Sequence, residues 1–243
     1  MTAQTPGAFL ALWNGIDRPE ARAEYEAWHA FEHVPERVGL PGFVYGRRYA
    51  SDLGDFTLYG LQDLTVLDAP AYADVVARPT PWSARMRPRL SAFVRRPCVL
   101  QAQAGLSWGA ALTTLMAHTT DLPAWRQAIA PALVQAVQEG RLLRAMAGVV
   151  PPERPLHYPV GGERITEPEA GQTAVVVLVE HLDGLACAQG AQWLVEHLRP
   201  WHRGEPQQGA FSLQSHVNRS QLATSEAGRA APLLDLMARY GGQ

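Results

Sequence analysis

The stretch Glu24–Tyr49, EYEAWHAFEHVPERVGLPGFVYGRRY, predicts a helix, a turn and a strand in succession. Small and apolar residues recur along one arc of its first part, which is typical of a helix that lies on a sheet. Leu40-Pro41-Gly42 predicts the turn. Residues 43–50 then predict a strand, whose side chains alternate between two faces. One face would hold Phe43, Tyr45, Arg47 and Tyr49, and the other Val44, Gly46 and Arg48.

The flanking segments complete one βαββαβ unit. An apolar strand at residues 8–13 precedes the helix, and a strand at 56–64 forms a hairpin with 43–50. A second helix at 69–77, an irregular loop at 78–88, a helical turn at 90–93 and a closing strand at 98–103 follow. This order of elements is the ferredoxin-like arrangement.

The same order starts again after residue 105. Strands are predicted at 110–117, 141–149, 173–182 and 211–217, with helices at 122–139 and 185–198 and a long loop at 151–171. A short amphipathic helix at 233–240 lies outside the repeat. The predicted fold class is therefore α+β, with residues 1–105 and 106–243 as two ferredoxin-like halves.

Several residues recur at matching places in the two halves, which indicates a tandem duplication. Trp28, Pro35 and Gly42 correspond to Trp125, Pro131 and Gly140. The polar residues do not recur, because His29 and His33 align with Arg126 and Ala130. The second half thus keeps the packing residues and loses the histidines.

Composition limits the classes of partner. With 47% hydrophobic and 18% charged residues, the chain is typical of a soluble globular protein. A net charge of -2 without a basic stripe argues against nucleic acid and acidic membranes. All basic residues are arginines, which excludes Schiff-base lysine chemistry. Cys98 and Cys187 are expected as buried thiols. No signal-peptide pattern or membrane-spanning apolar run is evident, so we expect a cytoplasmic protein.

Two histidines in the opening stretch are the main candidates for chemistry. His29 and His33 have a spacing that suits metal ligands, but the glutamate is misplaced for an HExxH site and no third ligand is evident, so no metal is expected. His29 falls off the apolar arc and is expected at the surface. Pro35 disfavours helical geometry at Val34, and we expect a kink or break there that turns His33 between helix and sheet.

Histidine transfers protons near neutral pH, and arginine holds an enolate, phenolate or carboxylate. Arg47 and Arg48 point to opposite strand faces, so at most one reaches a given pocket, and the other is expected to pair with Glu32 or Glu36. The candidate catalytic residues are His33 and Arg47, and the candidate substrate-binding residues are His29, Tyr45, Arg48, Tyr49, Tyr59 and Trp82. For the aromatic residues, ordinary core packing is the alternative.

The pattern Trp28-His29-x3-His33-x-Pro35-Glu36-Arg37, followed by Pro41-Gly42-Phe43 and Arg47-Arg48-Tyr49, resembles the first helix and second strand of EthD-like proteins. These belong to the dimeric α+β-barrel superfamily, with antibiotic-biosynthesis monooxygenases, muconolactone isomerases and dye-decolorising peroxidases. The resemblance covers the first half; the second half matches only in element order. It implies two ferredoxin-like sheets packed face to face as a barrel, with a pocket between helices and sheet. The chain would be a monomeric pseudo-dimer or a homodimer.

The resemblance also implies a small hydrophobic or aromatic substrate, often no cofactor, and an acid/base role for His33. We therefore expect a cofactor-independent lyase or isomerase that acts on a small aromatic or ring-derived catabolite. Two alternatives stay open. One is oxygen chemistry by a monooxygenase-type enzyme, either cofactor-free or with haem, and the other is a non-catalytic barrel that binds a hydrophobic molecule. Fold analogy does not fix the reaction.

Overall fold

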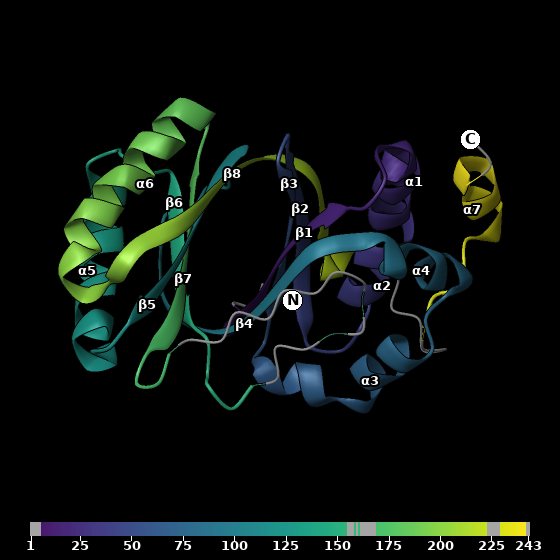
Figure 1. Ribbon diagram of the computed structural model, residues 1–243, viewed down its shortest axis with the longest axis horizontal. Helices are drawn as coiled ribbons and strands as arrows, with labels where there is room; N and C mark the ends of the chain where they lie inside the picture. Colours follow the sequence, from purple (N-terminus) through teal and green to yellow (C-terminus); the bar gives the residue numbers. More distant parts are fainter. Residues whose placement is uncertain (1–5, 155–157, 159, 161–168, 223–228, 242–243) are drawn as a thin grey trace.

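The computed structural model describes residues 6–154, 158, 160, 169–222 and 229–241. In these residues the strands form a closed barrel in the order β1-β3-β2-β8-β5-β7-β6-β4, with helices on its outside (Figure 1). The strands are β1 (Ala8–Ile16), β2 (Phe43–Ser51), β3 (Gly54–Leu61), β4 (Leu90–Ala104), β5 (Ala111–Thr119), β6 (Arg144–Val149), β7 (Thr173–His181) and β8 (Arg203–Asn218).

Each half of the chain contributes antiparallel strands in the ferredoxin-like order. This order is β4-β1-β3-β2 in the first half and β8-β5-β7-β6 in the second. The two long strands extend beyond their own halves, since β4 pairs with β6 over residues 99–104 and β8 pairs with β2 over residues 212–218. These two seams close the barrel and cover the strand edges that each half alone would leave open. The α+β fold class is as the sequence predicts.

The helices form one outer layer on each half (Figure 1). The first half carries η1 (Pro19–Ala21), α1 (Arg22–Ala27), η2 (Trp28–His33), α2 (Val34–Val38), η3 (Leu64–Asp68), α3 (Pro70–Ala77), α4 (Pro81–Met86) and η4 (Arg87–Arg89). The second half carries α5 (Leu122–Gln138), α6 (Gly184–Leu198), η5 (Arg199–Trp201) and η6 (Arg219–Gln221). α7 (Leu234–Gly241) packs outside α1 and α4.

Apolar side chains gather in three cores. One lies between the first-half helices and their sheet and includes Trp28, Phe43 and Tyr59. A second lies between α5, α6 and the second-half sheet. The third fills the barrel and includes Tyr45 and Tyr49. The barrel interior is therefore packed core, as in other small barrels.

Three segments differ from the sequence-based expectation. Residues 90–93, expected as a helical turn, begin β4, and residues 81–86 of the expected irregular loop form α4. Thr80 explains this helix, because its side chain accepts the N–H of Ser83 and Pro81 follows in the first turn. β8 begins at Arg203 instead of residue 211, because its early part pairs with β5. Tertiary pairing, which local pattern does not reveal, extends this strand.

The pairing of β2 with β3 shifts register between Phe43 and Tyr45. Such a bulge changes the face to which neighbouring side chains point. Phe43 therefore joins the core under the helices, whereas Tyr45 and Tyr49 point into the barrel. The expectation that Phe43 shares a face with these two tyrosines is wrong.

Among the helices of the described residues, none combines the length and the apolar character required to cross a membrane.

Candidate functional site

The helix that covers the first-half sheet changes its hydrogen-bond pattern at Trp28. α1 is followed by the π-helical segment η2 and then by α2, without a break. The N–H of Val34 donates to the carbonyl of His29, five residues earlier, as in a π-helix. Pro35 gives the physical reason, because in a regular α-helix its ring would clash with the carbonyl four residues earlier. Of the kink or break expected at Val34, the break does not occur, because the helix continues to Val38 after the π-helical turn.

The π-helical turn brings three rings together under the helix. Trp28 and His29 are stacked, with ring centroids 4.6 Å apart and planes at 10°. The His33 ring lies 4.4 Å from that of Trp28 and 5.2 Å from that of His29. His29 is only 4% exposed. The expectation of a surface histidine is therefore wrong, because it assumed the period of a regular α-helix.

Hydrogen bonds to the start of α4 fix the rotation of this helix about its axis. Trp28 Nε1 donates to Ser83 Oγ at 3.1 Å. One turn further along, Glu32 Oε1 accepts from Thr80 Oγ1 at 2.5 Å. All four side chains are buried, so these bonds are shielded from competing water. They fix Trp28, and with it the two histidine rings that contact its indole.

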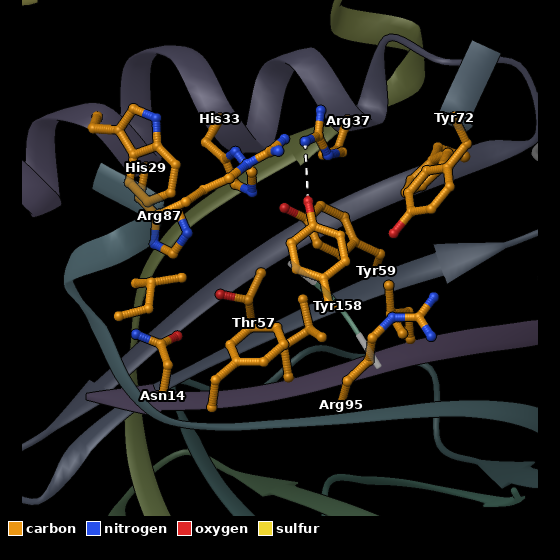
Figure 2. Close-up of a pocket in the computed structure, with 16 residues that line it drawn as sticks. Asn14, His29, His33, Arg37, Thr57, Tyr59, Tyr72, Arg87, Arg95 and Tyr158 are labelled. Carbon is orange, nitrogen blue, oxygen red and sulfur yellow. Dashed lines mark hydrogen bonds between the residues drawn. The ribbon is translucent and has the colours of Figure 1, made fainter. Parts of the chain in front are cut away.

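A pocket lies between this helix and the outer face of the first-half sheet (Figure 2). Apolar and aromatic side chains form much of its wall. The polar lining residues are Asn14, His29, His33, Arg37, Thr57, Tyr59, Tyr72, Arg87, Arg95 and Tyr158. In Figure 2 the histidines and Arg37 descend from the helix, while Asn14 and Thr57 approach from the strands opposite.

Several buried polar atoms on this wall have no hydrogen-bond partner among the described residues. They include Nδ1 of His29, Nδ1 of His33, Oγ1 of Thr57, Oη of Tyr59 and Nε of Arg87. A buried polar group without a partner costs on the order of 1–3 kcal/mol, and buried polar groups in folded proteins are nearly always paired. Their gathering on one cavity indicates that its contents, water or a ligand, supply the partners.

The pocket is positively charged. Arg37, Arg87 and Arg95 line it, and no described lining residue is a carboxylate. Arg37 pairs with Glu36 at 2.8 Å. Arg87 donates to two backbone carbonyls at the end of α3, at 2.7 and 2.8 Å, and forms no ion pair with any described residue. Arginine keeps its charge in such a setting, so the pocket favours a ligand that carries or develops negative charge.

Both histidines are held in the neutral form. Burial is the main cause that lowers the pKa of each ring well below its ordinary value. The guanidinium of Arg48 adds to the lowering of the pKa of His29, and that of Arg37 does so at His33. A neutral imidazole accepts a proton, and its pKa rises once an anion offsets the nearby positive charge. The pocket therefore combines a proton acceptor with fixed cations.

The cavity is small as its wall now lies. It offers about 30 Å³ to the centres of water molecules, which is space for about two of them. All lining residues but one lie on helices or strands of the first half. The exception is Tyr158, from the connection between β6 and β7, whose ring lies between Arg37 and Arg95 (Figure 2). Tyr158 therefore limits the volume of the pocket.

Arg47 does not meet His33. Its side chain points into the barrel, where the guanidinium pairs with Glu180 at 3.2 Å and donates to Tyr49 Oη at 3.0 Å. It also lies 3.5 Å from the ring centre of Trp108. The expectation that Arg47 holds an anion beside His33 is therefore wrong in its geometry. Arg37, which belongs to the same helix as His33, lines the pocket instead.

Tyr45 and Tyr49 belong to the barrel core and do not line the pocket. Burial raises the pKa of Tyr45 to about 12, so its phenol stays protonated at neutral pH. The expectation that these two tyrosines contact a ligand beside His33 is therefore not met. Their side chains lie on the opposite face of β2 from the helix.

Arg48 and Trp82 lie on the helix side but outside the pocket wall. Arg48 pairs with Asp55 at 2.9 Å and with Glu26, a partner that the sequence did not suggest. Trp82 Nε1 donates to Glu24 Oε1 at 3.1 Å and so helps to fix the helix. Of the residues predicted from sequence, the pocket wall brings together His29, His33 and Tyr59.

Sequence reasoning missed much of the polar wall. Arg37 had a signal, because it follows His33 by four residues, and Thr57 precedes Tyr59 by two on a predicted strand. Arg87 and Tyr158 had none, because they enter from segments without a recognisable pattern. Their position depends on how distant parts of the chain pack.

The second half lacks this arrangement. α5 takes the place of the π-containing helix and is a regular α-helix despite Pro131 within it. Trp125 and Ile129 are buried, whereas Arg126 and Ala130, which align with the two histidines, are exposed. Apolar side chains fill the space below α5. Apart from Tyr158, the residues that line the pocket belong to the first half.

No protein family description and no curated protein sequence matches this chain. Solved structures with the same fold include an anthrone oxidase-like protein, with a TM-score of 0.59, 11% identity and coverage of 95% of this chain and 99% of that one. A monooxygenase-like protein from Lactobacillus acidophilus matches with a TM-score of 0.53 and 11% identity, over 88% of this chain and 97% of that one. Another monooxygenase-like protein, from Fusobacterium nucleatum, matches with a TM-score of 0.52 and 10% identity, over 90% of this chain and 96% of that one. The chain therefore has the dimeric α+β-barrel fold.

Proposed function

We propose that this protein is a cofactor-independent enzyme that removes a proton from a small aromatic or ring-derived molecule bound in the pocket. His33 acts as the general base, and Arg37 and Arg87 hold the anion that forms. One observation carries the proposal: two buried, neutral histidines with unpaired Nδ1 atoms share an enclosed pocket with three arginines and no described carboxylate.

Charge compensation would drive the first step. Transfer of a proton from the ligand to His33 leaves an enolate or phenolate near Arg87, which has no carboxylate partner among the described residues. Such an interaction is stronger in a buried pocket than in water, because fewer solvent dipoles screen it. The anion in turn stabilises the protonated imidazole. His29 is neutral and stacked on Trp28, so it adds no positive charge that would repel the protonated imidazole of His33.

The fate of the anion decides the reaction class. Return of the proton to another carbon gives isomerisation, and loss of a leaving group gives elimination, as a lyase or isomerase would carry out. Transfer of electrons to dioxygen instead gives monooxygenase-type chemistry. The names of the anthrone oxidase-like and monooxygenase-like structures favour this second candidate, although a shared fold is a weak warrant for function. Both classes begin with the same proton transfer.

A haem-dependent oxidoreductase is the other oxidative alternative. His29 and His33 offer imidazole ligands, and the arginines offer partners for propionates. The space does not fit, because the cavity accepts about two water molecules as its wall lies. The small volume equally favours a non-catalytic barrel that binds a hydrophobic molecule. The unpaired polar atoms favour the enzyme over such a barrel, because a purely apolar ligand would leave them unpaired.

We also propose that the two halves arose by tandem duplication and that the first half, residues 1–105, is EthD-like. The equal strand order of the halves and the burial of both Trp28 and Trp125 support this origin. On this proposal residues 106–243 act as a scaffold that closes the barrel in place of a second subunit.

Turnover assays test the function. Purified protein is offered a panel of monocyclic phenols, naphthols, anthrones and unsaturated lactones, with absorbance and oxygen uptake followed together. We expect turnover of at least one compound, and a loss of kcat/KM of about a hundredfold or more in His33→Asn, as for other general bases. Oxygen uptake in step with turnover assigns the monooxygenase class, and its absence assigns the lyase or isomerase class. A Soret band in the purified protein would assign haem chemistry.

The matched control is His197→Asn. His197 is exposed on α6, where it stacks on Trp193 at 4.8 Å, far in the sequence from the pocket helix. This variant is expected to retain wild-type turnover. Equal rates for wild type and a folded His33→Asn variant on every substrate found would refute the proposal.

A further inference from the structure

Tyr158 lies in the pocket as a phenolic ligand would. Its ring stacks on Phe93, with centroids 5.7 Å apart and planes at 30°. The guanidinium carbon of Arg87 lies 5.5 Å from the ring centre. Its Oη accepts a hydrogen bond from Arg37 Nη2 at 3.3 Å (Figure 2). An aromatic face, a cation over the ring and a charged donor at the oxygen are the contacts that recognise a phenol.

The origin of Tyr158 sets it apart from the rest of the wall. The other lining residues belong to helices and strands whose backbones are hydrogen-bonded within the first half. Ligand pockets commonly enclose about 300 Å³ or more, whereas this cavity has room for about two waters. Among the lining residues, Tyr158 is the one that lies outside the helices and strands.

We propose that the pocket binds a monocyclic, para-substituted phenol in the place of the Tyr158 side chain, so that Tyr158 is an internal competitor of the ligand. This inference rests on the proposed function in that it names the substrate class of the same pocket. A para substituent is expected, because the Cβ of Tyr158 is attached to the ring carbon opposite the hydroxyl that Arg37 contacts. A substituent at that position of an external phenol would take the place of Cβ.

Charge explains why an external phenol can displace the internal one. Arg87 is buried and has no ion-pair partner among the described residues. Tyr158 contacts it through the face of its ring. An external phenol that passes its proton to His33 becomes a phenolate, and its charge then compensates the guanidiniums of Arg37 and Arg87. The fixed tether of Tyr158 gives it a high local concentration, which the ligand overcomes by this added attraction.

Cavity complementation tests the proposal. Tyr158→Ala removes the ring and the hydroxyl and keeps Cβ. The space left is that of a phenol, and 4-methylphenol, which is the tyrosine side chain as a free molecule, exceeds it by this one carbon. Binding of 4-methylphenol and of toluene to both proteins is measured by calorimetry, with thermal shift as a second readout. We expect 4-methylphenol to bind Tyr158→Ala at least about tenfold more tightly than wild type. Toluene should bind the variant about tenfold more weakly than 4-methylphenol, because it lacks the oxygen for Arg37.

Tyr158→Phe is the matched control, because it keeps the ring in the pocket and should gain no affinity for 4-methylphenol over wild type. Equal affinity of wild type and folded Tyr158→Ala for 4-methylphenol would overturn the proposal. So would equal affinity of the variant for 4-methylphenol and toluene. If circular dichroism shows that Tyr158→Ala does not fold, Tyr158→Leu, which keeps some apolar bulk, is judged by the same two comparisons.

Binding and catalysis are separated by a second substitution. Tyr158→Ala combined with His33→Asn is expected to keep the preference for 4-methylphenol over toluene, because Arg37 and Phe93 make the contacts with the oxygen and the ring. Failure of catalysis in His33→Asn therefore leaves this inference intact. Failure of 4-methylphenol to bind leaves the general-base proposal to be judged on turnover alone.

Discussion

The rings of Trp28 and His33 lie 4.4 Å apart although the two residues are five positions apart in the chain. In a regular α-helix the neighbours on one face are three and four residues apart. The π-helical segment closes the five-residue step, and Pro35, just beyond it, explains why the wider turn occurs there. The chemistry of the pocket thus depends on a local departure from α-helical geometry, a feature that is frequent at functional sites.

Pro35→Ala should undo this departure. Alanine restores the missing N–H and removes the ring clash, so residues 28–34 can return to α-helical geometry. We expect His33 to rotate away from Trp28 and its pKa to rise toward the ordinary value, followed by an NMR titration of its ring. Stability should change by no more than about 1 kcal/mol, since alanine is a good helix former. Pro131→Ala, in the regular helix α5, is the control. An unchanged His33 titration would contradict the prediction.

The two pocket histidines should make stability depend on pH. Their pKa values in the folded protein lie below the unfolded value of about 6.5, so the unfolded chain binds more protons below that pH. The free energy of unfolding is therefore highest, as far as these histidines are concerned, above about pH 6.5, and it decreases as the pH falls toward their pKa values in the folded protein. The limiting slope is about 1.4 kcal/mol per pH unit for each histidine.

Urea denaturation between about pH 8 and about pH 5 measures this slope. The double variant His29→Asn, His33→Asn should show a flatter profile, while His197→Asn should follow wild type. Equal slopes for wild type and the double variant would show that the buried histidines do not carry the effect.

Arg47 and Glu180 should act on stability more than on activity. Both side chains are 2% exposed and pair at 3.2 Å inside the barrel. Arg47→Met or Glu180→Met leaves the other charge buried without that partner, at a cost of about 3–5 kcal/mol. Replacing both by Met should recover much of this loss. Thermal and urea unfolding of the wild type, the two single variants and the double variant measure these changes. A double variant that is folded but has lost turnover would contradict the prediction and would indicate that Arg47 has a role in activity.

Thr80 should stabilise the helix that carries the histidines. Its Oγ1 donates to Glu32 Oε1 and accepts the N–H of Ser83 at 3.1 Å, which caps α4. Thr80→Val keeps the shape and loses both bonds, and we expect a loss of about 2–3 kcal/mol in urea unfolding. Thr120→Val, at an exposed position, should change stability by less than about 0.5 kcal/mol. Similar losses in both variants would contradict a specific role for Thr80.

Local patterns carry much of the fold of this chain. Apolar runs and turn residues place the strands near residues 8, 43, 111 and 173 close to where they lie, and the repeated order indicates the α+β class. The segment Glu24–Tyr49 also supplies His29 and His33 to the pocket, together with β2, the strand that pairs with the strand of Tyr59. These features follow from short-range sterics and hydrophobic periodicity, which act over a few residues.

The sequence by itself thus determined the main elements, their order and the presence of two histidines beside Pro35. Only the tertiary structure decided which atoms meet. Seams between distant strands lengthen β4 and β8, and the π-turn buries His29 where an α-helical wheel exposes it. Packing sends Arg47 into the barrel and brings Arg87 and Tyr158 to the pocket. The physical reason is that side-chain direction and long-range contact depend on how whole layers pack, and local propensity does not encode this.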